Sequence, residues 1–214
     1  MIKLRDLTFR YTDQRPVLEA LDFHLAEGEK IGLVGPNGAG KTTLFHLIVG
    51  LLAPTSGEIE IFGQPRREER DFWEVRERIG FLFQDPDDQL FCPTVGEDVA
   101  FGPLNLGKSR EEVRQIAHQT LQLLSLEHLE ERVTHHLSGG EKRLASLATV
   151  LAMEPTALLL DEPTAGLAEE MIERVSEVLE NHVQTCIIIS HNRPFLERNV
   201  NRIYRMAEGK ISPL

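Results

Sequence analysis

The stretch that most constrains this chain is a glycine-rich loop that ends in a lysine and two threonines. It matches the pattern G-x-x-x-x-G-K-[ST] at every specified position. The loop consists of Gly35, Pro36, Asn37, Gly38, Ala39, Gly40, Lys41, Thr42 and Thr43. An apolar run, 31–34, precedes the loop and an amphipathic stretch, 42–51, follows it. This strand–loop–helix context favours a phosphate-binding loop over a glycine-rich turn with an incidental lysine.

Each residue type in the loop suits a triphosphate ligand. Glycines allow the backbone to turn tightly, so that successive N–H groups converge on phosphate oxygens. The N-terminus of the following helix adds a partial positive charge. We expect Lys41 to reach the β- and γ-phosphates and the hydroxyl of Thr42 to bind Mg²⁺. The sequence therefore predicts a site for a nucleoside triphosphate.

A second signal is an apolar strand, 157–160, that ends in the two carboxylates Asp161 and Glu162. In open α/β sheets, ligands bind at the carboxyl ends of the strands. We expect Asp161 to support Mg²⁺ through water and Glu162 to accept a proton from the water that attacks the γ-phosphate. The alternative is an exposed acidic turn, but pairing with the phosphate loop favours the catalytic interpretation.

The third signal is a serine followed by glycines at the start of a predicted helix, 138–153. The residues are Ser138, Gly139, Gly140 and Glu141, directly after Leu137. Such a helix N-terminus accepts anions. Two phosphate sites in one chain make sense if each nucleotide lies between two chains, the loop of one facing the serine–glycine turn of the other. The alternative is a simple helix cap.

Composition excludes several classes of protein. The chain has 214 residues, 41% hydrophobic and 27% charged, which fits a single globular domain with an inserted lobe. The formal charge of −11 argues against a broad basic surface for nucleic acid. Cys92 and Cys186 lack metal-ligand spacing, so reduced thiols in a cytoplasmic protein are expected. No signal peptide or membrane-spanning run is found, so a membrane role requires a partner.

Hydrophobic patterning predicts an α/β fold interrupted by helices. Strands are predicted at 2–9, 17–25, 31–34, 58–62, 79–83, 157–160, 185–189 and 203–206, the last strand, with a turn over 12–16. Helices are predicted at 42–51, within the charged stretch 66–78, and at 95–101, 109–124, 138–153 and 169–182. We therefore expect one domain, 1–214, with its core at 1–84 and 155–214 and a helical subdomain at about 85–154.

In their order, these motifs closely resemble those of the ATP-binding cassette (ABC) ATPases over essentially the whole chain. Further matching positions are Tyr11 before the second strand, Gln84 after a strand, and His191. The resemblance implies a P-loop NTPase core of ABC type with an antiparallel β subdomain and an inserted helical subdomain. It also implies that Tyr11 stacks on adenine, that Gln84 contacts Mg²⁺ and the attacking water, and that His191 contacts the γ-phosphate. Without the family pattern, Tyr11 could be a packing residue, Gln84 a loop-capping amide and His191 a solvated loop histidine.

The segment 84–103 resembles the ATPases of energy-coupling-factor importers, which take up cobalt or nickel ions or vitamins. The resemblance implies a homodimer or heterodimer of ATPase subunits at the cytoplasmic face of the membrane. It further implies a transmembrane coupling subunit that docks near Gln84–Phe101 and a substrate-binding membrane subunit. Apolar Leu90 and Phe91 beside the acidic stretch 85–88 suit an amphipathic helix with basic residues. The alternative is that both are core residues beside a solvated turn.

The chain departs from the family pattern at several positions. Ala168 stands where an aspartate is usual, and Asn192 follows the histidine where an aspartate is common. The signature ends in Glu141 rather than glutamine, and Leu144 replaces an arginine, with Arg143 one place earlier. None of these changes removes a predicted catalytic group. We expect an active ATPase with altered coupling between its two sites, the alternative being a degenerate subunit paired with a catalytic partner.

Two other classes of function are alternatives for a chain with these motifs. A soluble cassette acting on nucleic acid or ribosomes predicts basic patches, long coiled-coil insertions or two cassettes in one chain. This sequence has one cassette and a charge of −11, so we expect no nucleic-acid partner. A phosphotransferase would need an acceptor site, for which the sequence offers no signal. The sequence does not indicate the transported solute, because the ATPase subunit does not contact it.

Overall fold

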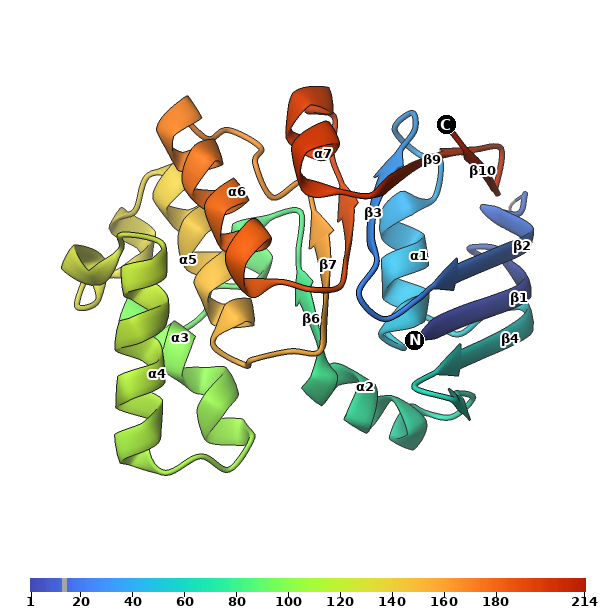
Figure 1. Cartoon of the computed structure of the whole chain (residues 1–214). Coiled ribbons are helices and arrows are strands. Elements are labelled where there is room, and N and C mark those ends of the chain that lie inside the picture. Colours follow the sequence, from blue (N-terminus) through green and yellow to red (C-terminus); the bar gives the residue numbers. More distant parts are fainter. Residues whose placement is uncertain (13–14) are drawn as a thin grey trace.

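The computed structural model describes residues 1–12 and 15–214 (Figure 1). Residues 13 and 14, inside the turn predicted over 12–16, lie outside the described part. The smaller of two sheets is antiparallel, with strand order β2-β1-β4-β5. Its strands are β1 (Ile2–Phe9), β2 (Leu18–Leu25), β4 (Ser56–Ile61) and β5 (Gln64–Pro65). Ile2, Leu4, Leu7 and Phe9 of β1 are buried among more exposed neighbours, as expected for a sheet with one covered face.

The larger sheet has the order β10-β9-β3-β8-β7-β6. Its strands are β3 (Lys30–Val34), β6 (Ile79–Leu82), β7 (Ala157–Asp161), β8 (Cys186–Ile189), β9 (Arg202–Ala207) and β10 (Lys210–Pro213). All neighbours pair in parallel except β10, which is antiparallel to β9. Every residue of β7 is buried because helices or strands cover both faces of this sheet.

Seven α-helices connect and cover the sheets in the described chain. They are α1 (Lys41–Ile48), α2 (Trp73–Arg78), α3 (Val95–Asn105), α4 (Arg110–Leu123), α5 (Gly139–Leu151), α6 (Glu169–His182) and α7 (Arg193–Asn199). Helix α1 lies between the two sheets (Figure 1). Helices α3, α4 and α5 gather on the side of the larger sheet away from the antiparallel sheet (Figure 1).

Two hydrophobic cores meet at the larger sheet. Side chains alternate across a strand, so Leu158 and Leu160 of β7 pack in the core beneath α5 and α6, whereas Leu159 packs in the core around α1. Phe45 of α1 is fully buried in the second core. The end of β7 is therefore packed on both faces.

The α/β fold predicted from the sequence is confirmed, and the helix predicted over 169–182 is α6 with the same bounds. Strand β1 also has its predicted bounds, 2–9, and the other predicted elements differ by a few residues at their ends. The prediction that 203–206 is the last strand is wrong, since β10 follows it. Helix α7, with only seven residues, was not predicted. Among the described residues, no helix is both long and apolar enough to cross a membrane.

Candidate nucleotide-binding site

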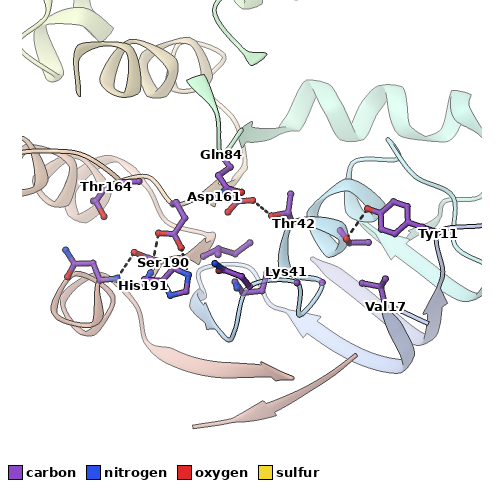
Figure 2. A pocket seen from close by; sticks show the side chains of 17 residues that line it. Tyr11, Val17, Lys41, Thr42, Gln84, Asp161, Thr164, Ser190 and His191 are labelled. Atoms are coloured by element: carbon purple, nitrogen blue, oxygen red, sulfur yellow. Dashed lines mark hydrogen bonds and ion pairs between the residues drawn. The ribbon is translucent and has the colours of Figure 1, made fainter. Parts of the chain in front are cut away.

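A cavity of about 820 Å³ lies beside the phosphate loop, at the carboxyl ends of β7 and β8 (Figure 2). It brings together most residues that the sequence singled out. The predicted residues that line it are Tyr11, Asn37, Gly38, Gly40, Lys41, Thr42, Thr43, Gln84, Asp161, Glu162 and His191. Gly35, Pro36 and Ala39 belong to the same loop but are not among its lining residues.

Two loop glycines sit where a side chain would collide. A Cβ atom on Gly35 would lie 2.1 Å from the carbonyl oxygen of Met206. Gly40 precedes α1 with a φ of 96°, in the left-handed region, and its Cβ would lie 2.9 Å from side-chain atoms of Val17 and Leu18. Glycine is therefore needed at both positions for the loop to turn into α1.

Lys41 begins α1 and folds back across the loop. Its Nζ donates hydrogen bonds to the carbonyl oxygens of Gly35 at 2.8 Å and Pro36 at 3.0 Å. The side chain is 8% exposed. Burial lowers the pKa of Lys41, while the carboxylates of Glu162 and Asp161 raise it. The ammonium group is thus held at the loop, facing two acidic residues.

Asp161 ends β7 and is 1% exposed. Its Oδ2 accepts a hydrogen bond of 2.5 Å from the Thr42 hydroxyl, which links the acidic strand end to the start of α1. Burial raises the pKa of Asp161, and the Thr42 hydrogen bond and the charge of Lys41 oppose this shift. The predicted pairing of the phosphate loop with the end of β7 is thus present in the structure.

Glu162 follows with a φ of 51°, a left-handed conformation that a residue with a side chain rarely adopts. Its backbone N–H donates to the carbonyl of Ile189 at 2.9 Å, which fixes this turn on β8. The Oε2 atom accepts from the backbone N–H of His191 at 3.3 Å. The Oε1 atom is buried without a hydrogen-bond partner among the described residues, and His191 Nε2 lies 3.5 Å from it. Burial raises the pKa of Glu162, which the His191 N–H opposes.

The donor set fits a magnesium ion. Mg²⁺ prefers hard oxygen ligands and is commonly held by one or two carboxylates plus phosphates. The Thr42 hydroxyl, the Asp161 carboxylate and the Gln84 side chain line one cavity, and Glu162 adds a buried oxygen without a partner in the described chain. Phosphate oxygens of a bound nucleotide would supply the remaining ligands.

Tyr11 lies at the edge of the cavity, 40% exposed, with its hydroxyl 3.1 Å from Thr43 Oγ1 (Figure 2). The residues Ser138 to Glu141, by contrast, do not appear among those lining the cavity. Ser138 caps α5, and its Oγ donates to Glu141 Oε2 at 2.7 Å while accepting from the Glu141 backbone N–H at 3.3 Å. Within one chain, the serine–glycine turn is therefore separate from the phosphate loop.

Sequence reasoning missed several lining residues, namely Val17, Thr164, Ala165, Ile189 and Ser190. Ser190 directly precedes His191 and Thr164 lies two residues after Glu162, so closeness to the motif residues was an available signal. Asn192 also lines the cavity, and its side chain caps α7 by accepting from the Phe195 N–H at 3.1 Å. This residue therefore has a structural role of its own.

The exposed fractions of other singled-out residues show where each side chain lies. Leu90 is 7% exposed, so the expectation that it lines an external docking groove is wrong, and it packs in the core under α5 and α6. Phe91 is 66% exposed, in line with that expectation. Ala168 precedes α6 without a side-chain cap, and Leu144 is buried at 3% exposure.

A glycine-rich loop between β3 and α1, facing two carboxylates at the end of β7, defines a nucleoside triphosphatase of the phosphate-loop class. The family model described as "ABC transporter" matches residues 18–165. The chain belongs to the ABC transporter family, and it is an ATP-binding ATPase whose hydrolysis of ATP is coupled to transport.

Relatives and solved structures agree with this assignment. A putative ABC transporter ATP-binding protein of Brucella suis is 54% identical over 94% of this chain and 84% of its own length. The energy-coupling factor transporter ATP-binding protein EcfA of Methanocaldococcus jannaschii is 43% identical over 99% of this chain and 77% of its own.

CbiO1 from Clostridium perfringens, described as part of the ABC transporter complex cbiONQ, superposes with a TM-score of 0.86 at 35% identity. The match covers 99% of this chain and 86% of that one. A dimeric ATP-binding cassette in a post-hydrolysis state, bound to ADP and Pi, has a TM-score of 0.89 at 25% identity, covering 99% and 97%.

Proposed function

We propose that this chain is the ATP-hydrolysing subunit of an importer of the energy-coupling-factor type, bound peripherally to the cytoplasmic face of the membrane. The observation that carries the proposal is a groove that shares Thr42 and Gln84 with the nucleotide cavity and is lined by the carboxylates of Asp85 and Asp88. The 43% identity to EcfA over nearly the whole chain supports it. Cobalt or nickel ions or a vitamin are the solutes we assign to this importer.

In the proposed site, the triphosphate of ATP lies on the loop 35–43 with adenine against Tyr11. Lys41 neutralises charge on the β- and γ-phosphates, and loop N–H groups and the α1 N-terminus bind their oxygens. Thr42, Asp161 and Gln84 would hold Mg²⁺, which when bound neutralises charge on the phosphate oxygens.

Glu162 is the proton acceptor in this mechanism. Its buried Oε1, without a hydrogen-bond partner in the described chain, is free to accept a proton from the attacking water. The raised pKa of Glu162 makes its carboxylate a better base than an exposed glutamate. We assign to His191, whose backbone N–H holds the other carboxylate oxygen, a contact with the γ-phosphate.

The site is completed by a second copy of the chain. Ser138, Gly139, Gly140 and Glu141 begin α5 away from the cavity of their own chain. We assign them to the γ-phosphate held on the loop of the partner copy. Two ATP molecules would then lie between two chains, and hydrolysis would loosen the dimer. In this proposal the chain has a core, 1–84 and 155–214, and a helical subdomain, about 85–154. These two parts move relative to each other.

The transmembrane partner is proposed to dock on the groove beside Gln84. This groove, of about 600 Å³, is lined by Phe81, Phe83, Asp85 and Asp88 in addition to the shared residues. Phe91 and Phe101 lie further along the segment, 66% and 46% exposed, with ring centroids 4.8 Å apart. Carboxylates beside exposed rings suit an amphipathic helix that carries basic residues.

Co-purification tests this function. We expect the tagged chain to bring down a transmembrane coupling protein and a substrate-binding membrane protein from detergent-solubilised membranes. The double substitution Phe91→Ser and Phe101→Ser should lower their recovery at least about tenfold, the effect of losing apolar anchors. ATP binding should stay unchanged. The matched control is Trp73→Ser, which removes an aromatic side chain that is 63% exposed on α2. Recovery of nucleic acid or ribosomes in place of membrane proteins would contradict the proposal.

A further inference from the structure

Gln84 lies on a segment whose backbone is anchored to the side of α5. Strand β6 ends at Leu82, so Phe83 and Gln84 no longer pair within the sheet. The guanidinium of Arg143, on α5, donates to the carbonyl oxygen of Phe83 at 2.8 Å and also to that of Gln84. Arg143 is 5% exposed, and these two bonds are partly buried.

A second side chain ties the same segment to α5. Gln89 Oε1 accepts from the backbone N–H of Phe83 at 3.1 Å. Its Nε2 donates to the carbonyl oxygen of Ser146 at 2.9 Å and to Thr149 Oγ1 at 2.8 Å, both on α5. The N–H and C=O of Phe83 are therefore both satisfied by side chains that are themselves fixed on this helix.

A third contact closes the link near the tip of the segment. Lys142 Nζ lies 2.6 Å from Asp87 Oδ1, and the lysine side chain is 18% exposed. Lys142 and Arg143 follow Glu141 directly, so the residues that anchor the Gln84 segment adjoin the serine–glycine turn. These contacts connect the start of α5 to the backbone at Gln84, and partly buried hydrogen bonds are costly to leave unmade.

The charge of Arg143 also reaches the catalytic carboxylates. Burial lowers the pKa of Arg143, while the charges of Asp85, Asp161 and Glu162 raise it. Its Nε atom has no hydrogen-bond partner among the described residues, so its two terminal nitrogens carry the anchoring. A neutral side chain of similar length would leave the carbonyls of Phe83 and Gln84 without these donors.

We propose that Arg143 is a positioning residue for ATP hydrolysis. By holding the carbonyls of Phe83 and Gln84, it makes the Gln84 side chain follow the start of α5 into the nucleotide cavity. This inference rests on the proposed function, in which Gln84 holds Mg²⁺, and on the contact with the attacking water that the family resemblance implies. Arg143 adjoins the serine–glycine turn, and in this proposal it links that turn to Gln84 within one chain.

The test is a double-mutant cycle on the full-length purified chain with Mg-ATP. Arg143→Met should lower kcat about tenfold or more, as misplacement of a group by about 1 Å can do, with KM for ATP within about twofold. Gln84→Ala should lower kcat similarly. The double variant should be no more than about twofold slower than the slower single variant, because both remove one function. Arg143→Lys, which can still donate, should recover kcat to within about threefold of wild type.

The control is Arg114→Met, which neutralises an arginine on α4 whose side chain is 75% exposed, and it should keep wild-type kcat. If Arg143→Met fails to fold by thermal unfolding, Gln89→Leu breaks the same link and should give the same loss of kcat without a change in KM. Wild-type kcat in Arg143→Met or its Gln89→Leu substitute, alongside a slow Gln84→Ala, would overturn this inference and leave the proposed function intact. Fully multiplicative losses in the double variant would also overturn it. A Gln84→Ala variant with wild-type kcat would instead remove the proposed role of Gln84, and the inference with it.

Discussion

Helices α1 and α5 both begin at glycine-rich turns, yet they satisfy the N–H groups of their first turns in opposite ways. Helix α1 begins after Gly40 with no side-chain cap and no acidic residue in its first turn. Helix α5 begins with a complete capping box, in which Ser138 and Glu141 bond each other's backbone N–H groups. The first helix leaves its N–H groups and partial positive charge to a ligand. At the second helix, the Ser138 hydroxyl accepts from the N–H of Glu141, and the Glu141 carboxylate accepts from the N–H and hydroxyl of Ser138.

This difference bears on how the nucleotide site assembles. The end of α1 is ready for phosphate in a single chain, with Lys41 already folded across the loop. At α5, the Ser138 hydroxyl donates to Glu141 and must be released before it can donate to a γ-phosphate. We therefore expect ATP to bind first at α1 and α5 to join in a second, weaker step. The predictions below separate these steps.

The largest effect is expected at α1. Lys41→Ala removes the cation that faces the β- and γ-phosphates, and we expect turnover to fall about 100- to 1,000-fold. ATP binding to the single chain should weaken as well, measured by calorimetry. Lys108→Ala, on an exposed lysine paired with Glu154, should leave both unchanged. Normal ATP binding by Lys41→Ala would contradict the role of α1 as the first site.

At α5, removal of the serine should affect assembly and not the first binding step. Ser138→Ala should lower turnover about tenfold, with ATP binding to the single chain within about twofold of wild type. Loss of the cap should also cost about 1 kcal/mol, a fall in Tm of roughly 2–4 °C. Weakened binding of ATP to the single chain would show that the two helix ends act at one step and would contradict this order of binding.

The smallest effect is expected from the carboxylate beside that serine. Glu141→Gln keeps an acceptor for the Ser138 N–H and removes a negative charge facing the proposed γ-phosphate. We expect ATP-dependent dimerisation in the Glu162→Gln background to tighten about three- to tenfold, which equals roughly 1 kcal/mol. An unchanged dimer constant would show that Glu141 is only a helix cap.

The same substitution has an opposite, pH-dependent effect on the single chain. Hydrogen bonds from Ser138 lower the pKa of Glu141. A lowered pKa stabilises the fold above the unfolded-state pKa, and this contribution is lost as the pH falls through the folded-state pKa. The free energy of unfolding of wild type should therefore exceed that of Glu141→Gln at neutral pH by a few tenths of a kcal/mol after solvent screening. The gap should close on acidification, and a gap independent of pH would contradict this assignment.

Much of the site was predictable because its chemistry is written in short local motifs. The loop 35–43 and the pair Asp161–Glu162 need only a strand before them to be placed, and the structure joins them through the Thr42–Asp161 hydrogen bond. Helix α6 was predicted with the observed bounds because its apolar side chains recur along one face. Motif and periodicity are local signals, and they succeed where local sequence decides the structure.

The remaining features depend on contacts between distant residues. Strand β10, Lys210-Ile211-Ser212-Pro213, lacks a strand pattern of its own and exists because it pairs with β9 at the sheet edge. Arg66 lies in a charged stretch, yet it is 7% exposed because the carbonyls of Ile61 and Asp71 accept its guanidinium. Such partners appear only when the fold brings them together.

The anchoring of the Gln84 segment has the same origin. Arg143 and Phe83 are separated by sixty positions in the chain, so no local pattern connects them. The arginine was visible in the sequence only as a displaced family residue beside Leu144. Its contacts with two carbonyls, and those of Gln89 with α5, required the three-dimensional structure.

The central prediction is that the α1 loop of one copy and the α5 N-terminus of another bind the same ATP. The most direct measurement is the solution mass of Glu162→Gln with Mg-ATP, by light scattering after size exclusion. We predict a species of twice the 24.2 kDa of one chain, which disappears without ATP and when Lys41→Ala is added. A mass that stays at 24.2 kDa while ATP is bound would contradict it.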